Sequence, residues 1–143
     1  MIGDVLAPLL GNLLGASIFE RRRRRRLASA LENGRPLVFP GSVLGDTAYC
    51  HPGGGMLRVD GASLSWLTGT GGMAFRVPVE RLAVRSLADV RASESFTGGD
   101  NVAVLCDDAG AAVRIVVLRS DLPYLAIAVP GLRALLPPTG HEG

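Results

Sequence analysis

The stretch MLRVDGASLSWLT, residues 56–68, decides the fold class of this chain. Apolar and polar residues alternate on both sides of Asp60-Gly61, and an Asp-Gly pair between two such runs is a strong signal for a β-hairpin. We expect strands on both sides of the pair, with positive φ angles at both of its residues. Leu64 and Trp66 are two residues apart, so they share one face of the second strand, which we predict to be buried.

Similar alternation extends from this hairpin in both directions and predicts about seven short strands. Residues 79–93 fit either a helix or short strands, and we predict strands there. Pro78 lacks the N–H donor that a central strand needs, so the strand that contains it should lie at an edge. A second hairpin turn is expected at Asp107-Asp108-Ala109-Gly110. The expected strands are 42–50, 56–59, 62–68, 73–79, short strands within 79–93, 101–106 and 111–118.

A C-terminal helix is predicted after the last strand. Ser120 is a suitable N-cap residue, Pro123 is tolerated in a first turn, and apolar residues recur at helical spacing as far as Leu136. Pro130-Gly131 should kink or split this helix. The fold class is therefore mainly β (α+β), with one core formed by strands and helix. The expected core residues are Leu57, Leu64, Trp66, Phe75, Val77, Val104, Val113, Ile115, Val117, Leu125 and Leu132.

The N-terminal region has the pattern of an amphipathic helix that interacts with a membrane. Residues 2–19 contain no basic residue, small or polar residues recur along one face, and leucines occupy the other. Six consecutive arginines follow, Arg21, Arg22, Arg23, Arg24, Arg25 and Arg26. We expect the helix to continue past them and to end at Asn33-Gly34. Three placements fit this helix, namely spanning the bilayer, lying on its surface or packing on its own domain, and the pattern favours the first.

The arginine block and the small face of the helix predict a location and two kinds of partner. Basic residues stay on the cytoplasmic side of a cell membrane, so the globular part should be cytoplasmic and the arginines should contact anionic lipid headgroups. Gly11 and Gly15 would let a second helix approach closely, and Asn12 would form a hydrogen bond across that contact. We therefore expect this helix to form a homodimer or to contact another membrane protein.

The composition narrows the function classes. The 143 residues are 48% hydrophobic and 20% charged, which is typical of one folded domain. All 15 basic residues are arginine, so mechanisms that need a lysine are excluded. The net charge of +2 depends on the arginine block, because residues 27–143 carry nine arginines against eleven acidic residues, a net charge of −2. A nucleic-acid-binding domain usually carries basic residues across its folded surface, so we expect no nucleic acid partner.

The residue types that usually carry chemistry are few and scattered. Cys50 and Cys106 lie far apart in the sequence without a disulfide-rich pattern, and we expect two buried or half-buried thiols. His51 lies in a glycine-rich loop with no further ligands at zinc spacing, so no metal site is predicted. The glycine clusters lack the strand–loop–helix context of a nucleotide-binding loop. We expect a protein that is not an enzyme, with no catalytic residue and no cofactor.

The whole arrangement resembles a family of short actinobacterial membrane proteins of unknown function that contain a pleckstrin-homology-like (PH-like) domain. The resemblance is carried by the arginine block, by residues 60–66, by VAVLCD at 102–107 and by residues 120–136. It implies a PH-like, seven-stranded open barrel or sandwich that is closed by the C-terminal helix. The family supplies no catalytic residues to compare.

These patterns favour a membrane-tethered, non-catalytic protein-interaction module, whose helix anchors the chain and whose β domain presents a surface to an unknown protein partner. Two alternatives stay open, a peripheral lipid-binding PH-like module and an accessory subunit of a larger membrane assembly. The arginines of the β domain are spread along a sequence with net negative charge, which disfavours the lipid-binding module. The expected regions are a membrane-associated helix with the arginine block at 1–34, a PH-like β domain at 35–138 and a tail at 139–143.

Overall fold

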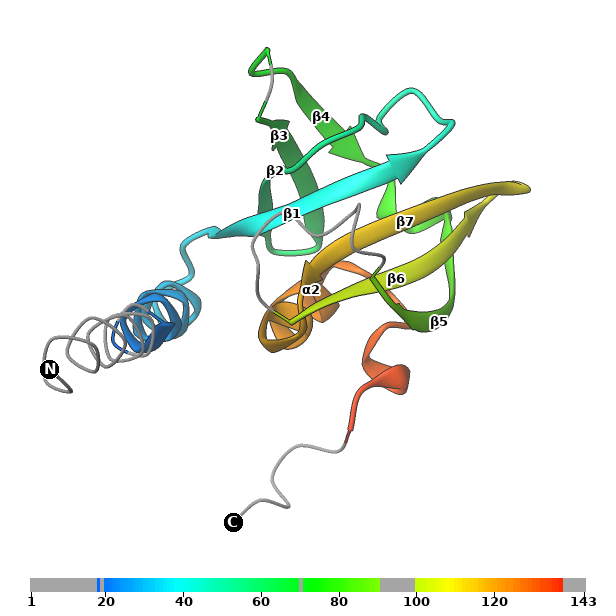
Figure 1. Cartoon of the computed structure of the whole chain (residues 1–143). Helices are drawn as coiled ribbons and strands as arrows, with labels where there is room; N and C mark the ends of the chain where they lie inside the picture. The colour runs from blue at the N-terminus through cyan, green and yellow to red at the C-terminus, as the bar shows by residue number, and fades with distance from the viewer. Residues whose placement is uncertain (1–17, 19, 70, 91–99, 138–143) are drawn as a thin grey trace, which may run out of the picture. The chain divides into compact units, whose positions relative to one another are not determined.

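The structure, a computed structural model, describes residues 18, 20–69, 71–90 and 100–137. Its internal contacts divide the chain into two units, Met1–Arg35 and Pro36–Gly143. The first contributes a helix and the second contains all the strands (Figure 1). Each unit is described by itself below.

The N-terminal helix covers residues 20–32 of the described chain, and residue 18 is also helical. Its end has the hydrogen bonds of a Schellman motif. The N–H of Gly34 donates to the carbonyl of Leu31 at 3.2 Å, and the N–H of Arg35 donates to the carbonyl of Ala30 at 2.8 Å. The predicted helix end at Asn33-Gly34 is therefore confirmed.

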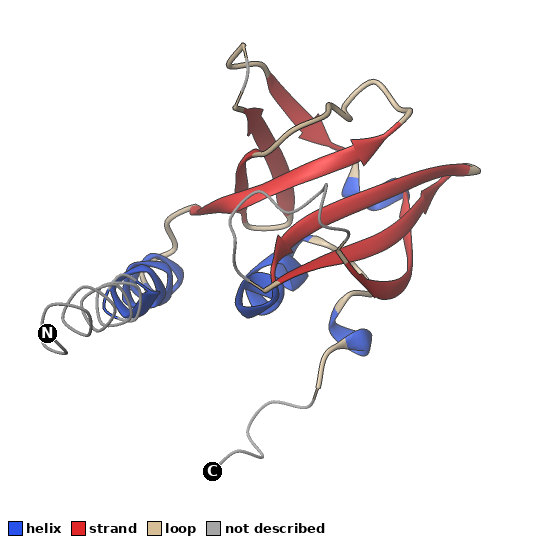
Figure 2. Ribbon diagram, in the orientation of Figure 1, coloured by secondary structure: helices blue, strands red, loops and turns tan. Residues whose placement is uncertain are grey.

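Seven antiparallel strands form one open sheet, which confirms the mainly β class (Figure 2). Their order in the sheet is β4-β3-β2-β1-β7-β6-β5. The strand β4 lies at one edge, directly before Pro78, as predicted. Their bounds are β1 (Leu37–Gly45), β2 (Gly55–Asp60), β3 (Ser63–Thr68), β4 (Ala74–Val77), β5 (Leu82–Asp89), β6 (Asn101–Asp108) and β7 (Ala111–Leu118).

The strand β1 joins two halves of the sheet. Its first part pairs with β2 as far as Gly41, and the part from Gly41 onward pairs with β7. We call β1 to β4 the four-stranded half and β5 to β7 the three-stranded half. A Cβ atom at Gly41 would lie 2.5 Å from Cδ1 of Leu57 and 3.0 Å from the carbonyl oxygen of Val116. At Gly41, atoms of both halves therefore leave no room for a side chain.

The prediction of a strand at 42–50 is wrong at both ends. The strand β1 begins at Leu37 and accommodates Pro40, because this part of β1 has a neighbouring strand on one side only. Beyond Gly45 the chain turns, and the N–H of Cys50 donates to the carbonyl of Thr47 at 3.1 Å. This turn takes the residues after β1 out of the sheet.

The β2–β3 turn lies one residue later than the sequence pattern suggested, and the β6–β7 turn consists of only the last two of the four predicted residues. Asp60 pairs with Ser63, so the turn is Gly61-Ala62, and of these two only Gly61 has a positive φ, 60°. This is the pattern of a type II′ turn, whereas the predicted positive φ at Asp60 is wrong. In the β6–β7 hairpin the turn residues are Ala109 and Gly110, with φ of 51° and 95°, as in a type I′ turn.

The predicted core is confirmed except at one position. Ten of the eleven expected side chains are buried, and Phe75 is half-buried because β4 is an edge strand. The Phe75 ring packs near Trp66, with 6.2 Å between the ring centroids. In the 79–93 region, the structure has a 3-10 turn η1 (Val79–Arg81) before β5, so a strand is confirmed over Leu82–Asp89, while residues 91–93 lie outside the described residues.

The C-terminal helix is shorter than predicted. It consists of a 3-10 turn η3 (Arg119–Asp121), the helix α2 (Leu122–Ala128) and a second 3-10 turn η4 (Arg133–Leu135). The N-cap of α2 is Asp121, so the predicted cap at Ser120 is wrong, because η3 occupies that position. Pro130-Gly131 splits the helix, with a φ of 87° at Gly131.

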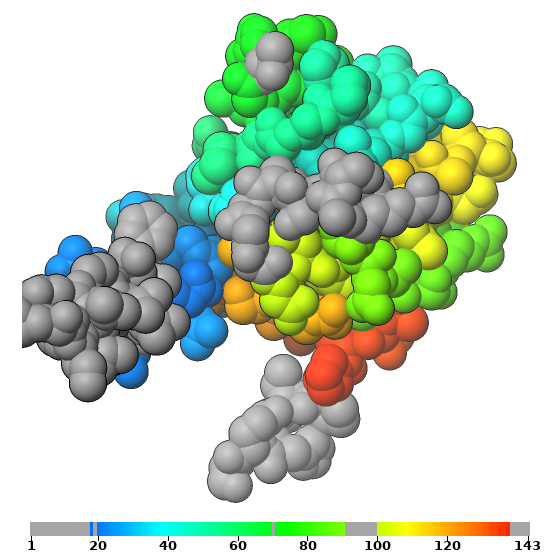
Figure 3. Space-filling view, viewed as in Figure 1, coloured from blue at the N-terminus to red at the C-terminus, as the bar shows by residue number. Residues whose placement is uncertain are grey.

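The segments after β7 cover one side of the sheet. Helix α2 contacts β2, and its Leu125 side chain is fully buried. A Cβ atom at Gly131 would lie 3.8 Å from Cβ of Val84 on β5. The space-filling view shows these orange and red segments below the green and yellow strands of the three-stranded half (Figure 3).

Candidate functional site

The six predicted arginines all lie on the N-terminal helix. Arg23 is buried, with 8% of its surface exposed. The other five are exposed, namely Arg21, Arg22, Arg24, Arg25 and Arg26. An α-helix has about 3.6 residues per turn, so five exposed residues among six consecutive ones extend around most of the helix circumference. The helix therefore presents a cationic collar, a name that we keep for these five exposed arginines.

One glutamate balances part of this charge. Nη2 of Arg23 lies 2.7 Å from Oε1 of Glu20, and Nε of Arg24 lies 3.5 Å from the same oxygen. Residues 20–32 contain six arginines and two glutamates, so the helix keeps a net charge of +4. Guanidinium groups bind phosphate oxygens through two parallel hydrogen bonds. The cationic collar is consequently suited to a surface of phosphate groups.

The predicted helix-packing residues Gly11, Asn12 and Gly15 lie outside the described residues. In the part of the chain that the structure does describe, none of the helices is both long enough and apolar enough to cross a membrane.

Two arginines of the β unit come together although they are distant in the sequence. Arg58 pairs in register with Ser65, and Ser65 pairs with Arg76, so the two arginines share one row, two strands apart. Each also has an acidic neighbour, with 3.7 Å between Arg58 and Asp60 and 3.3 Å between Arg76 and Glu80. This row could not be predicted from the sequence, because it depends on the register of three strands.

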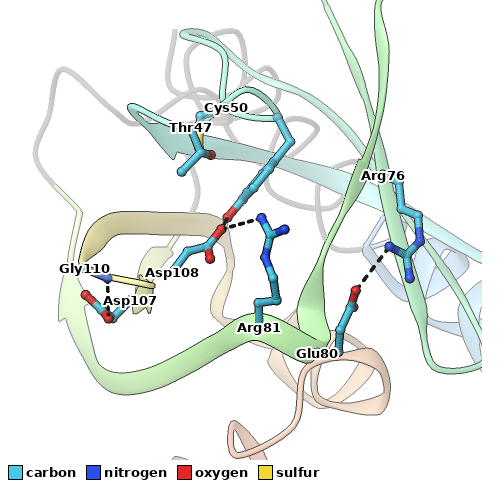
Figure 4. Close-up of polar contacts among 9 residues, drawn as sticks. Thr47, Cys50, Arg76, Glu80, Arg81, Asp107, Asp108 and Gly110 are labelled. Atoms are coloured by element: carbon cyan, nitrogen blue, oxygen red, sulfur yellow. Dashed lines mark hydrogen bonds and ion pairs between the residues drawn. The ribbon is translucent and has the colours of Figure 1, made fainter.

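Two further arginines of the β unit contact aspartates of β6. Nη2 of Arg81 donates to Oδ2 of Asp108 at 3.0 Å (Figure 4). Nη2 of Arg85 lies 3.8 Å from Oδ2 of Asp107. Arg91, another arginine of the β unit, lies outside the described residues. These contacts hold Arg81 and Arg85 within their own half of the sheet.

A polar cluster around the buried residues Tyr49 and Asp108 could not be predicted from the sequence. The hydroxyl of Tyr49 donates to Oδ2 of Asp108 at 2.6 Å, and Nε1 of Trp66 donates to the carbonyl of Tyr49 at 2.8 Å. Tyr49 thereby connects β6 in the three-stranded half with β3 in the four-stranded half. We call Tyr49, Trp66, Arg81 and Asp108 the Tyr49 clamp. The sequence pattern assigned Asp107 and Asp108 to a turn, which is wrong, because both residues lie in β6 and pair with Ala112 and Ala111 of β7.

The electrostatics of the Tyr49 clamp favour a charged Asp108 and a neutral Tyr49. Hydrogen bonds from Arg81 and Tyr49 lower the pKa of Asp108 below its ordinary value. Burial, and then the hydrogen bond to Asp108, raise the pKa of Tyr49 to about 12. Asp108 thus accepts both hydrogen bonds as a carboxylate, and the clamp is a structural contact rather than an acid–base pair poised near neutral pH.

The remaining chemical groups are engaged in local contacts. Cys106 is buried, which raises the pKa of its thiol to about 11, and Cys50 is half-buried, so the two predicted thiols are confirmed. The Cys50 sulfur lies 2.9 Å from the Thr47 hydroxyl. His51 is half-buried, with Nδ1 2.9 Å from the carbonyl oxygen of Pro52. Among the described residues, no group of three or more His, Cys, Asp or Glu side chains is arranged to hold a metal ion.

A comparison of this chain with protein families, with curated proteins and with solved structures finds no match.

Proposed function

We propose that this chain is a membrane-tethered, non-catalytic protein-interaction module on the cytoplasmic face of the cell membrane. The N-terminal helix binds anionic lipid through its cationic collar, and the β unit presents a surface to a protein partner. The single observation that carries the proposal is the exposure of five of the six arginines on one continuous helix. Its alternatives, a purely lipid-binding module and a subunit of a larger assembly, lack an observation of their own.

The magnitude of the lipid attraction supports this reading. Each basic residue near an anionic leaflet contributes about 1 kcal/mol of binding free energy. Five exposed arginines on one helix are therefore enough to hold a chain of this size at such a surface, provided that the ionic strength is physiological. The net charge of −2 over residues 27–143 leaves the collar as the basic centre of the chain.

The β unit supports an interaction role more than a catalytic one. Seven antiparallel strands followed by a short helix favour a PH-like barrel, a framework that usually presents edges and faces to partners. Asp108, the most buried carboxylate with described partners, is held by Tyr49 and Arg81. The Cys106 thiol stays protonated at neutral pH because of its burial.

Flotation of the full chain with lipid vesicles tests the proposal. We expect binding to vesicles that contain phosphatidylserine and much weaker binding to vesicles of phosphatidylcholine alone. A variant with glutamine at the five collar positions should lose at least about a hundredfold in affinity for the anionic vesicles. The matched control replaces Arg85, Arg114, Arg119 and Arg133 of the β unit by glutamine and should bind as the natural chain does. Equal binding of the collar variant and the natural chain contradicts the proposal.

Self-association through the N-terminal helix stays a second part of the proposal. Substitution of both Gly11 and Gly15 by isoleucine keeps the helix apolar but prevents close approach of a second helix. We expect this double variant to crosslink less as a dimer in detergent while it still binds vesicles. Unchanged crosslinking contradicts the homodimer, and lost vesicle binding contradicts the apolar helix as an anchor.

A further inference from the structure

An apolar row crosses the outward face of the four-stranded half. Pro40, Met56, Leu67 and Ala74 are successive cross-strand neighbours from β1 to β4. Met56 is 41% exposed and Leu67 is 47% exposed. Val38 lies two residues before Pro40 on the same face of β1 and is 48% exposed. We call these five residues the outer row.

Part of the corresponding face of the three-stranded half is covered. There Ser42, Val116 and Ala103 are cross-strand neighbours, and all three are buried, with Val116 at 0% exposure. Both sets start from the same outward face of β1. Among the described strand residues, the exposed large apolar side chains are Val38, Met56 and Leu67, which all belong to the outer row, and contiguous exposed apolar patches on proteins usually mark contact surfaces.

A row of polar side chains runs beside the outer row. Arg58, Ser65 and Arg76 are cross-strand neighbours on the same outward face. The ion pairs of both arginines are solvent-exposed, and pairs of this kind contribute only about 0–1 kcal/mol to stability. Phosphate groups can therefore replace Asp60 and Glu80 as partners of these guanidinium groups at little cost. Apolar side chains thus lie beside arginines that can exchange their acidic partners for phosphate groups. This combination matches the boundary between acyl chains and phosphate headgroups.

The outer row is too small to hold a folded protein partner alone. A stable protein interface buries about 800 Å² on each partner and is centred on aromatic anchors. The outer row offers three half-exposed aliphatic or thioether side chains and no aromatic ring, since Phe75 and Trp66 point to the other face. A weak contact of this size contributes when the chain is already held at the surface by a second contact, because the local concentration is then high.

The cationic collar supplies such a second contact, and the chain between the two is short. The helix ends at residue 32 and Val38 follows six residues later. Six extended residues span at most about 22 Å. When the helix is bound to lipid headgroups, this short segment keeps the outer row within reach of the same lipid surface. The charge of the collar and the charge of Arg58 and Arg76 have the same sign, as one anionic surface requires.

We infer that the outer row docks on the same anionic lipid surface as the cationic collar, with Met56, Leu67 and Val38 at the level of the acyl boundary and Arg58 and Arg76 among the headgroups. This inference rests on the proposed membrane tether and adds the orientation of the β unit to it. The four-stranded half then faces the lipid, and the edge strand β5 and the β6–β7 turn remain available to a protein partner.

Depth-dependent fluorescence quenching tests the orientation directly. The natural chain has one tryptophan, Trp66, which is 1% exposed and packs in the core. The variant Leu67→Trp adds an indole on the outward face, and Leu135→Trp adds one at a 38% exposed leucine on η4 as a matched control. With the full chain bound to phosphatidylserine vesicles that contain brominated lipid, we expect strong additional quenching for Leu67→Trp and none for Leu135→Trp.

Vesicle flotation gives a second, independent readout. The double variant Met56→Asn, Leu67→Asn adds no charge and should bind anionic vesicles about tenfold more weakly, whereas Leu135→Asn should bind as the natural chain does. The factor lost by the outer-row variant should be similar at 0.1 M and 0.3 M salt, because it reflects apolar contact. The factor lost by the collar variant should shrink as salt rises, because it reflects charge attraction.

The outcomes separate this inference from the proposed function. If the full chain does not bind vesicles at all, both fail. If the chain binds, the collar variant does not bind, and Leu67→Trp is no more quenched than Leu135→Trp, the tether stands and the orientation is overturned. Unchanged vesicle binding by the outer-row variant also overturns the orientation and leaves the outer row as a surface for a protein. Circular dichroism of each variant in solution confirms that the fold is intact before these results are compared.

Discussion

The two halves of the sheet share one construction on the inside and differ on the outside. Inward side chains such as Leu57 in the four-stranded half and Ile115 in the three-stranded half are both fully buried. Outward side chains are buried at Val116 and exposed at Leu67. Strict alternation along β2 and β3 therefore corresponds to one covered face, whereas β6 and β7 are buried on both faces over part of their length.

This difference shows what alternation in a sequence does and does not specify. A period of two tells which residues face the same way, because successive side chains of a strand point to opposite faces. It does not tell whether the second face meets solvent. An apolar residue on the outward face can thus be either buried or exposed. Substitution by a charged residue distinguishes the two cases, because it lowers the unfolding free energy much more at a buried position.

The largest expected effect is at the buried outward position. Val116→Asp places a carboxylate in a site without solvent, and we expect it to cost at least about 4 kcal/mol of unfolding free energy or to prevent folding. Leu67→Asp makes the same kind of change on an exposed outward position and should cost less than about 0.5 kcal/mol. Urea denaturation followed by circular dichroism measures both. Similar losses at the two positions would show that the outward faces of the two halves do not differ.

Truncation of inward residues should affect the two halves equally. Leu57→Ala and Ile115→Ala each remove a fully buried side chain, and we expect each to cost about 2–5 kcal/mol. Leu125→Ala in α2 should fall in the same range, because this leucine packs in the same core. Leu135→Ala is the control at an exposed site and should cost less than about 0.5 kcal/mol. A loss below that value at an inward position would mean that its strand or helix faces the other way.

The junction between the halves should be sensitive to a single methyl group. Gly41→Ala brings Cβ into contact with Leu57 and with the Val116 carbonyl, and we expect a cost of about 1–3 kcal/mol. Leu57→Val removes the Cδ1 atom that the new methyl group would contact, and by itself it also lowers the unfolding free energy. The double variant should lose less stability than the sum of the two single variants, because the shorter side chain leaves room for the new methyl group. A purely additive result would show that the backbone at Gly41 moves rather than the Leu57 side chain.

Local patterns predicted the strands and the core, while contacts distant in sequence stayed hidden. The Asp-Gly pair located the β2–β3 hairpin, yet the turn itself is Gly61-Ala62, because turn position depends on how the flanking residues pair. Ser120 has the right chemistry for a cap, but the chain forms a 3-10 turn there, and capping preferences do not distinguish the two. Such errors of one or two residues come from tertiary contacts that adjust the ends of elements.

The candidate site was predictable only where it consists of consecutive residues. The cationic collar follows from a run of arginines on a helix, and only the burial of Arg23 required the structure. The Tyr49 clamp joins residues 59 positions apart, and the outer row depends on the register of four strands. A single sequence offers no signal for either, since each depends on which strands become neighbours.

The smallest expected effect concerns the Tyr49 clamp, which connects the two halves of the sheet. Tyr49→Phe removes the hydrogen bond to Asp108 but keeps the ring and the backbone carbonyl that accepts from Trp66. We expect a cost of about 1–2 kcal/mol near pH 7, because a hydrogen bond to a charged group is lost while Arg81 still accompanies the carboxylate. A loss of less than a few tenths of a kcal/mol would show that the clamp does not help to hold the halves together.

The pH dependence identifies the clamp more specifically than the size of the loss does. The pKa of Tyr49 is raised from 10.0 to about 12, so its contribution to stability is complete below pH 10 and is lost as the pH rises through 12. Tyr49→Phe should abolish this part of the alkaline loss of stability. Cys106→Ala should abolish only an earlier part of it, between pH 9 and 11, because burial raises the pKa of this thiol to about 11.

On the acid side, the lowered pKa of Asp108 gives stability that is present above pH 3.8 and is lost as the pH falls through the folded-state value. Since Tyr49 is one of the two donors that lower this pKa, Tyr49→Phe should make the acid loss shallower as well. Flattening at both ends of the pH profile is the signature of a hydrogen bond between a phenol and a carboxylate, and flattening at the alkaline end alone would leave Arg81 as the only group that matters to Asp108.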